Sequence, residues 1–226
     1  MNSSTRLVEN NRETNSNEKE NIVAILEKTR TGQDQVAEKI KKVQELYADA
    51  PEVGRVALKN GLEALKLELA AAPGRQSAGR VGARQGRVSE LTAIIALEPG
   101  GGKRIRGLLD LLEGNFKGAD IVGTLHDMRF VLLDNDTKLL FCTTYDGEWD
   151  AYIDDFVTKI PNSMDILFCN CKGWPGIRSP VIKDWLVKHQ ITADAWYVAS
   201  PNLSVAEAWR LEKVGKAVDE LLDKIG

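Results

Sequence analysis

The sequence predicts an α+β fold, and two observations support this prediction. Between Ser89 and Trp174, apolar runs of strand length and segments of helical spacing follow in the order strand, helix, strand, strand, helix, strand. The first of these strands is apolar on both faces, so we expect it to be buried on both sides of its sheet. Its alternating residues are Leu91, Ala93, Ile95 and Leu97 on one side and Thr92, Ile94 and Ala96 on the other.

The first strand ends at Pro99, and Gly100-Gly101-Gly102 leads into a short amphipathic helix that stops near Gly114. These glycines lack both the Walker spacing and the full G-x-G-x-x-G pattern of phosphate-binding loops, so we interpret them as a strand-to-helix turn. Two strands follow, at about His126–Leu133 and Lys138–Tyr145. The Asx residues between these strands suit a tight turn and predict a hairpin.

A second helix is predicted from Trp149, because its apolar residues fall on one helical face. Pro161-Asn162-Ser163 then interrupts that pattern, and the apolar run Ile166–Cys171 is expected to form the fourth strand. Strand, helix, strand, strand, helix, strand is the order of a ferredoxin-like βαββαβ sheet. The residues on the face of the second helix are Trp149, Tyr152, Ile153, Phe156 and Ile160.

Further elements are expected after the sheet. Ser179-Pro180 opens a helix that runs to about His189, and Ala195–Ala199 is expected to add a short strand. Ser204 and Glu207 form a capping box that opens the last helix. Apolar residues then repeat at 3-4 spacing, so this seam is expected to pack on the sheet or on a second subunit. They are Leu211, Val214, Val218, Leu221 and Ile225.

The sequence divides into four predicted parts. Residues 1–19 have almost no side chains to bury, which predicts a disordered tail. Residues 20–72 show helical spacing and predict an N-terminal helical segment with a break at Pro51. Residues 73–88 contain four glycines and four arginines and no acid, so we interpret them as a basic linker whose arginines are solvated or bind an anion. Residues 89–226 form the α+β domain with its added C-terminal elements.

Composition excludes several classes of function. The chain of 226 residues is 43% apolar and carries a net charge of −3, so no overall positive field favours nucleic acid. No apolar run approaches the ~20 residues that span a bilayer, so no membrane partner is expected. Three cysteines form an odd set, and the polar N-terminus lacks a secretory signal, which indicates a reducing cytoplasm. Cys142, Cys169 and Cys171 provide no second pair for zinc and are interpreted as core residues.

Strands that are apolar on both faces raise the question of what covers the second face of the sheet. Two crossover helices cover only one face of a four-stranded sheet. A sheet from a second subunit would close a barrel around a cavity, and the N-terminal helices of the same chain are the alternative cover. We favour the homodimer. The N-terminal helices and the basic linker are also a candidate surface for a protein partner.

Three segments carry a resemblance to a known group. They are Leu91–Gly100, Gly123–Phe130 and Leu140–Gly147. Together they resemble a group of mostly uncharacterised bacterial proteins whose domain is similar to the dimeric α+β barrel superfamily, and the likeness covers about Ser89 to Ile225. That superfamily includes dye-decolourising peroxidases, chlorite dismutases, haem-degrading monooxygenases, aldoxime dehydratases, cofactor-free quinol monooxygenases, and small cyclases and isomerases. The resemblance therefore implies a cavity and leaves the reaction open. Of the peroxidase signature, only the Asp146-Gly147 end is present.

The second predicted strand carries the first candidate site residues. If His126 faces the cavity, its imidazole is suited to ligate haem iron or to act as a general base. If Arg129 faces it instead, the guanidinium is suited to hold a carboxylate or to polarise an oxygen substrate. Strand alternation places His126 with Met128 and Arg129 with Asp127, so only one of the two is expected to line a pocket. The alternative is that His126 satisfies a buried carbonyl and Arg129 pairs with Asp127 or Asp146.

Three further residues complete the predicted site. Asp146 is expected either to cap the helix near Trp149 or to act as a polar partner in the site. Tyr145 is expected to join the tryptophans in lining an aromatic pocket for a flat ligand such as a porphyrin or a quinone, with core packing as the alternative. His189 either complements the end of its helix or serves as the alternative iron ligand.

These residues lead to three functional hypotheses. The first is an oxidoreductase-type enzyme with a barrel cavity, a haem-dependent peroxidase or oxygenase acting on a small organic molecule. The second is a cofactor-free monooxygenase, cyclase or isomerase of the same fold. The third is a non-catalytic binding or assembly module, which predicts a filled barrel with no pocket.

Overall fold

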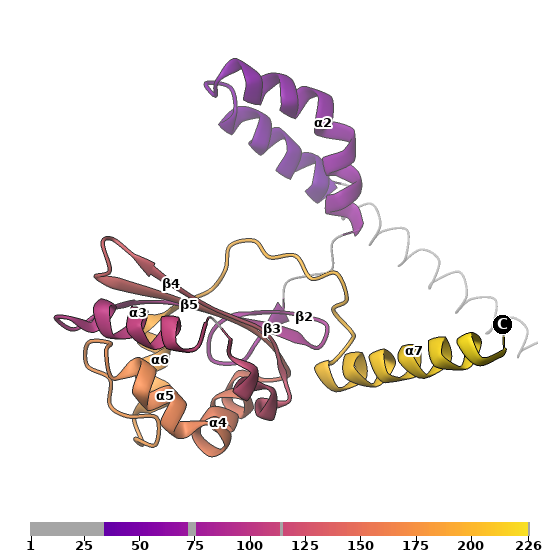
Figure 1. Cartoon of the computed structure of the whole chain (residues 1–226). Helices are drawn as coiled ribbons and strands as arrows, with labels where there is room; N and C mark the ends of the chain where they lie inside the picture. The colour runs from indigo at the N-terminus through magenta and orange to yellow at the C-terminus, as the bar shows by residue number, and fades with distance from the viewer. Residues whose placement is uncertain (1–33, 72–75, 114, 226) are drawn as a thin grey trace, which may run out of the picture. The chain divides into compact units, whose positions relative to one another are not determined.

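The computed structural model describes residues 34–71, 76–113 and 115–225, and Figure 1 shows the chain. The chain divides into two compact units, Met1–Pro73 and Gly74–Gly226. The predicted disordered tail, residues 1–19, and the first part of the predicted helical segment, residues 20–33, lie outside the described residues.

The N-terminal unit contains two helices in its described part. The first occupies residues 34–46, and the second, α2, spans Glu52–Ala71. α2 starts directly after Pro51, as predicted, because proline fits the start of a helix but cannot continue one. Ile40 is buried, whereas Val53 and Leu67 are exposed.

The second unit is built on an open antiparallel sheet of six strands, which confirms the α+β class. The strands are β1 (Gln76–Ser77), β2 (Ala83–Gln85), β3 (Val88–Ala96), β4 (Leu125–Leu133), β5 (Lys138–Asp146) and β6 (Gln190–Ile191). Their order is β1-β2-β3-β5-β4, and β6 also pairs with β3. β3 and β5 pair along their whole lengths, from Val88 opposite Asp146 to Ala96 opposite Lys138.

The hairpin predicted for β4 and β5 is confirmed. Asp134, Asn135 and Asp136 all have positive φ angles of 50°, 53° and 64° in its turn. Asn and Asp tolerate this left-handed region better than other non-glycine residues, which is why these residue types mark the turn in the sequence.

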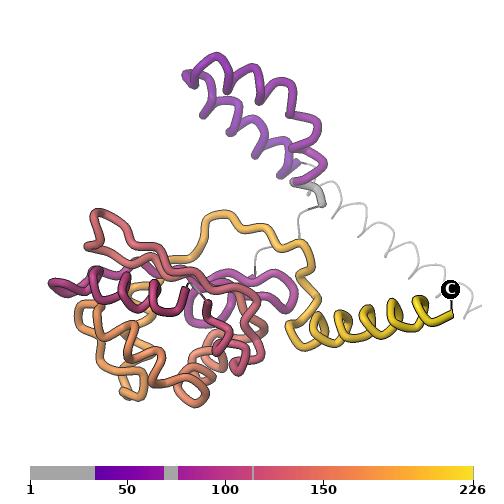
Figure 2. The backbone as a smooth tube through the Cα atoms, in the orientation of Figure 1, coloured from indigo at the N-terminus to yellow at the C-terminus, as the bar shows by residue number. Residues whose placement is uncertain are grey.

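Helices cover one face of the sheet. α3 (Gly101–Leu111) and the 3-10 helix η1 (Lys117–Val122) connect β3 to β4, while α4 (Trp149–Lys159), α5 (Pro161–Phe168) and α6 (Ile182–His189) follow β5. Figures 1 and 2 show α3, α4, α5 and α6 together on this side. The core between sheet and helices includes Leu91, Ile95 and Phe141 from the strands and Ile105, Trp149, Ile153, Phe156, Phe168 and Leu186 from the helices.

The glycines lie at the strand-to-helix turn that the sequence predicts, and Gly101 and Gly102 are the first two residues of α3. A Cβ atom on Gly102 would lie 2.5 Å from the carbonyl oxygen of Asp136, and one on Gly101 would lie 2.7 Å from that of Asn170. The first turn of α3 therefore approaches the β4–β5 turn and the residues after α5 more closely than any side chain would allow.

Two predicted strands are wrong. The run Ile166–Cys171 was expected to be the fourth strand, but its first residues complete α5, and Cys171 makes only an isolated bridge to Leu97. Pro161 occupies the start of α5 instead of ending the helical region, and a short apolar run does not distinguish a strand from a buried helix. Residues 195–199, predicted as an added strand, lie outside regular strands and helices.

The segment predicted to be a linker contributes to the sheet. Residues 76–88 contain β1, β2 and the start of β3. Three of its arginines have carboxylate partners: Arg80 contacts Asp150 at 3.0 Å, Arg87 contacts Glu207 at 3.0 Å, and Arg84 pairs with Glu148. The expectation of a basic stretch free to grip an anion is therefore wrong for these three residues, because acids distant in sequence pair with them.

The last helix, α7 (Val205–Ile225), confirms the predicted capping box. The amide of Ser204 donates to Glu207 Oε2 at 2.9 Å, and the amide of Glu207 donates to Ser204 Oγ at 3.3 Å. Val205 is the one buried residue of this helix, and its predicted apolar seam is exposed.

Candidate functional site

The second face of the sheet is covered at one end by the chain itself. Residues 192–203, here called the roof segment, run from β6 to α7 across this face, as Figures 1 and 2 show. The amide of Ala193 donates to the buried carboxylate of Glu90 at 3.1 Å, and the amide of Arg87 donates to Pro201 O at 2.8 Å. Gln85 Nε2 donates to Trp196 O at 2.7 Å. The roof segment is thus fixed at three points, to β2, to β3 and to the turn between these strands.

A pocket of about 270 Å³ lies between the roof segment and the sheet. Val88, His126 and Thr144 line it from the strands, and Ala208 lines it from α7. The roof contributes mainly apolar and aromatic side chains, which are Trp196, Tyr197, Val198, Ala199, Ser200 and Leu203. The pocket therefore combines the imidazole of His126 with a largely apolar and aromatic wall.

A β-bulge places His126 in this pocket. Leu125 pairs with Tyr145 and Asp127 pairs with Thr144, so His126 is an extra residue without a partner on β5. Such a bulge resets the alternation of side chains. The prediction that His126 and Met128 share a face is therefore wrong, because Met128 lines a cavity on the helix-covered side.

His126 forms a short contact with Asp146. Its Nε2 lies 2.7 Å from Asp146 Oδ1, and the two side chains are only 25% and 15% exposed. An ionised carboxylate only accepts hydrogen bonds, so Nε2 carries the proton. In the neutral ring the lone pair is then on Nδ1, which has no hydrogen-bond partner among the described residues. The interpretation of His126 as the donor to a buried backbone carbonyl is wrong.

Asp146 also holds the first turn of α7. Its Oδ2 accepts the amide hydrogen of Val205 at 2.8 Å, so one carboxylate joins β5, the bulge of β4 and α7. The prediction that Asp146 caps the helix near Trp149 is wrong, because the residue at that N-cap is Glu148. The sequence offered no signal for this contact, since Asp146 and Val205 are far apart along the chain.

Arg129 is on the same face of the sheet as Asp127 but does not line the pocket. Its Nε lies 2.9 Å from Asp127 Oδ2, and the guanidinium is largely exposed. This pair is the structural alternative that the sequence left open for Arg129.

Tyr145 points to the opposite face from its neighbour Asp146. It is fully buried and stacks on Tyr152 with ring centroids 3.7 Å apart, and neither hydroxyl has a hydrogen-bond partner in the described part of the chain. Burial, reinforced by the nearby charge of Glu90, raises the pKa of Tyr145 far above its ordinary value. Tyr145 therefore belongs to the core, which is the alternative that the sequence left open, and it does not line the His126 pocket.

His189 lies at the end of α6, away from the pocket lining. Its Nδ1 donates to the carbonyl of Trp185 at 2.8 Å, and its ring packs against the Trp185 ring with centroids 4.1 Å apart. The structure thus brings together His126 and Asp146 from the predicted site and leaves Arg129, Tyr145 and His189 outside it.

The residues present do not fit a haem or a metal ion. The nitrogen of His126 that would ligate iron, Nε2, is bound by Asp146. The pocket, at about 270 Å³, also lies below the range of about 300–1,000 Å³ that holds drug-sized ligands, and a porphyrin is at least of that size. No group of three or more His, Cys, Asp or Glu residues in residues 34–71, 76–113 and 115–225 is placed to hold a metal ion.

Comparisons with known proteins leave the family open. No family model matches the chain, and neither the curated proteins nor the solved structures include a match. Among the described residues, no helix is both long and apolar enough to cross a membrane.

Proposed function

We propose that the protein is an enzyme without a cofactor that binds a small, flat organic molecule under the roof segment, with His126 as its general base. The observation that carries this proposal is the 2.7 Å contact between His126 Nε2 and Asp146 Oδ1 at the wall of a pocket. A histidine fixed in one tautomer by a carboxylate is the arrangement that general-base catalysis requires.

The two side chains divide the chemistry between them. Asp146 orients the ring and leaves the Nδ1 lone pair available, so His126 takes a proton from the substrate at that nitrogen. The carboxylate then stabilises the imidazolium that forms. A positioned base of this kind contributes about 10²–10⁴-fold to a rate.

The pocket wall indicates the class of substrate. Trp196, Tyr197 and Leu203 offer apolar and aromatic surface, and none of the described residues that line the pocket is a Lys or Arg that could bind an anion. A neutral ring compound with an acidic proton, such as an enolisable ketone or a phenol, suits this lining. Proton abstraction from such compounds begins isomerisations, cyclisations and cofactor-free oxygenations.

Proton exchange into deuterium tests this proposal without knowledge of the product. The protein in D₂O is mixed with a panel of cyclic diketones, aryl ketones and hydroxyquinones, and ¹H NMR follows the loss of the exchangeable C–H signals. We expect catalysed exchange of at least one compound, a loss of about 10²-fold or more in His126→Gln, and no loss in His189→Gln. Equal exchange in the wild type and His126→Gln contradicts the role of His126.

The haem-dependent oxidoreductase is the alternative that the resemblance implied. It requires a rearrangement that frees Nε2 of His126 and enlarges the pocket. The visible spectrum of protein produced with haem precursor distinguishes the two proposals. A Soret band that disappears in His126→Ala and persists in His189→Ala supports the haem enzyme, whereas protein without a Soret band favours the cofactor-free enzyme.

We also propose that a second copy of the chain covers the rest of this sheet face. Beyond the roof segment, Ile94 and Val131 are 41% and 44% exposed, and Leu140 between them is only half-buried. Apolar side chains on three adjacent strands form a surface that a second sheet would bury. This arrangement would enlarge the enclosed volume next to His126.

A further inference from the structure

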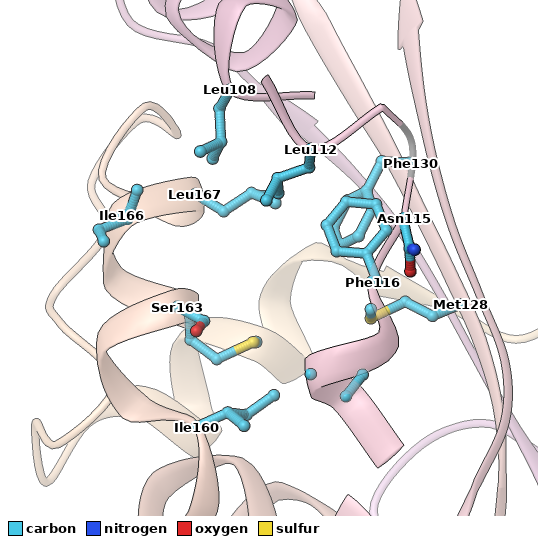
Figure 3. A pocket seen from close by; sticks show the side chains of 13 residues that line it. Leu108, Leu112, Asn115, Phe116, Met128, Phe130, Ile160, Ser163, Ile166 and Leu167 are labelled. Atoms are coloured by element: carbon cyan, nitrogen blue, oxygen red, sulfur yellow. The ribbon is translucent and has the colours of Figure 1, made fainter. Parts of the chain in front are cut away.

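A second cavity lies on the helix-covered side of the sheet, and the His126 proposal does not use it. Its volume is about 300 Å³. Leu108 and Leu112 line it from the end of α3, Met128 and Phe130 line it from β4, and α5 closes the opposite side. Figure 3 shows Phe116, Phe130 and Met128 across the cavity from Ser163, Ile166 and Leu167.

In the part of the chain that the structure describes, the lining of this cavity is almost entirely apolar and carries no charged side chain. Of the described residues that line it, only Asn115 and Ser163 have polar side chains, and Asn115 Oδ1 already accepts the amide hydrogen of Lys117 at 2.9 Å. An ionised ligand would lose its hydration here without finding a partner, so the lining selects against charge. A neutral apolar molecule loses little favourable hydration when it enters the cavity.

The cavity has a rigid wall and an apolar mouth. The Phe130 ring packs against Phe116 and Phe141, with centroids 5.2 Å and 5.0 Å away, which fixes its position. Ile166 and Leu112 also line the cavity and are 58% and 37% exposed, so the cavity reaches the surface between α3 and α5.

We propose that this cavity is a binding site for a small neutral aromatic or apolar molecule. A cavity of about 150 Å³ holds one benzene ring in another protein, so about twice that volume suits a fused two-ring compound or a short branched chain. Met128 on β4 and Met164 on α5 give the site a soft, polarisable surface from two sides, which favours aromatic ligands. This inference is independent of the His126 pocket, which lies on the other face of the sheet.

The methionines provide a direct test. The chain contains three, Met1, Met128 and Met164, and the last two line the cavity. Protein labelled with [methyl-¹³C]methionine is titrated with indole as the neutral probe and with indole-3-carboxylate as the charged probe. We expect the Met128 and Met164 methyl signals to shift in a saturable way with one common Kd, the Met1 signal to stay unchanged, and the carboxylate to cause no shift.

Filling the cavity provides the matched variants. Ala119→Leu adds side-chain volume inside the cavity from η1, whereas Ala151→Leu adds the same group on the exposed surface of α4. We expect Ala119→Leu to weaken indole binding at least tenfold and Ala151→Leu to leave it unchanged. Ser163→Leu fills the cavity from α5 and takes the place of Ala119→Leu if that variant does not fold.

Three results would overturn the proposal. The first is the absence of saturable shifts at Met128 and Met164 in folded protein up to the solubility limit of indole. The second is equal binding by the filled variants and the wild type. The third is equal binding of the charged probe, because the lining excludes charge.

Discussion

Replacing Asp146 by alanine removes two hydrogen bonds of one carboxylate. The resulting loss in the free energy of unfolding measures how much this carboxylate stabilises the candidate site. The lost contacts are those to His126 Nε2 at 2.7 Å and to the amide of Val205 at 2.8 Å. Because the Asp146 side chain is only 15% exposed, water replaces it poorly.

The expected loss of stability follows from these two hydrogen bonds. Hydrogen bonds to a charged group contribute about 1.5–3 kcal/mol each, and partial exposure places these near the lower end, so Asp146→Ala should destabilise the second unit by about 2–4 kcal/mol. Such a loss lowers the melting temperature by about 5–15 °C for a unit of this size. Asp146→Asn keeps one good acceptor and should cost about half as much.

Tryptophan fluorescence during urea unfolding is the appropriate assay. All five tryptophans lie after residue 73, so the signal reports on the unit Gly74–Gly226. Asp127→Ala is the matched control, because Asp127 lies on the same face and pairs only with the exposed Arg129. That substitution should change stability by less than about 0.5 kcal/mol. If Asp146→Ala lowers the free energy of unfolding as little as the control does, the Asp146 carboxylate does not stabilise the unit through its two hydrogen bonds.

Three further predictions concern α7, the roof segment and the open sheet face. Hydrogen bonds from Ser204 lower the pKa of Glu207, so the stability that this pair gives to the first turn of α7 is present at neutral pH and is lost as pH falls through the lowered pKa. The ¹³C shifts of the first turn should therefore move toward coil values at acid pH, and in Glu207→Gln they should lack this pH dependence. Glu90→Ala removes the buried acceptor of the Ala83 and Ala193 amides, should cost about 3–5 kcal/mol in urea unfolding, and should free the roof segment for rapid proteolysis. Ile94→Glu should convert a dimer into a monomer in analytical ultracentrifugation, and a wild type that is monomeric at about 50 μM would contradict the proposed pairing.

Strong local patterns were sufficient to predict the centre of the sheet. The strand β3, the Asx turn between β4 and β5, and the capping box of α7 each depend on residues close together in sequence, and each is confirmed. The expected burial of β3 on both faces is wrong for the end of the strand, because Ile94 is 41% exposed and Ala96 is also exposed. Local patterns gave wrong predictions where tertiary contacts determine whether a segment forms a strand or a helix. The apolar run after Pro161 suits a strand or a buried helix equally well, and packing against the sheet selects the helix.

The candidate site was likewise predicted only in part, in those features that residue type reveals. Residue type singled out His126 and Asp146, because histidine and carboxylate side chains carry acid–base chemistry. Their pairing depends on a one-residue bulge after Leu125, which no local pattern reveals, and the roof segment has neither strand nor helix periodicity. The apolar cavity was missed because Met128, Phe130 and Leu167 have the same spacing whether they fill a core or line a void.

The tautomers of the two histidines decide whether Nδ1 of His126 is free to accept a proton from a substrate. Long-range ¹H–¹⁵N NMR at pH 8 resolves both rings, since the chain has only His126 and His189. We expect opposite neutral tautomers, with the proton of His126 on Nε2 facing Asp146 and that of His189 on Nδ1 facing the Trp185 carbonyl. We also expect Asp146→Asn to change the His126 signals alone. A His126 ring that carries its proton on Nδ1 in the wild type, or that is insensitive to Asp146→Asn, would contradict the proposed general base.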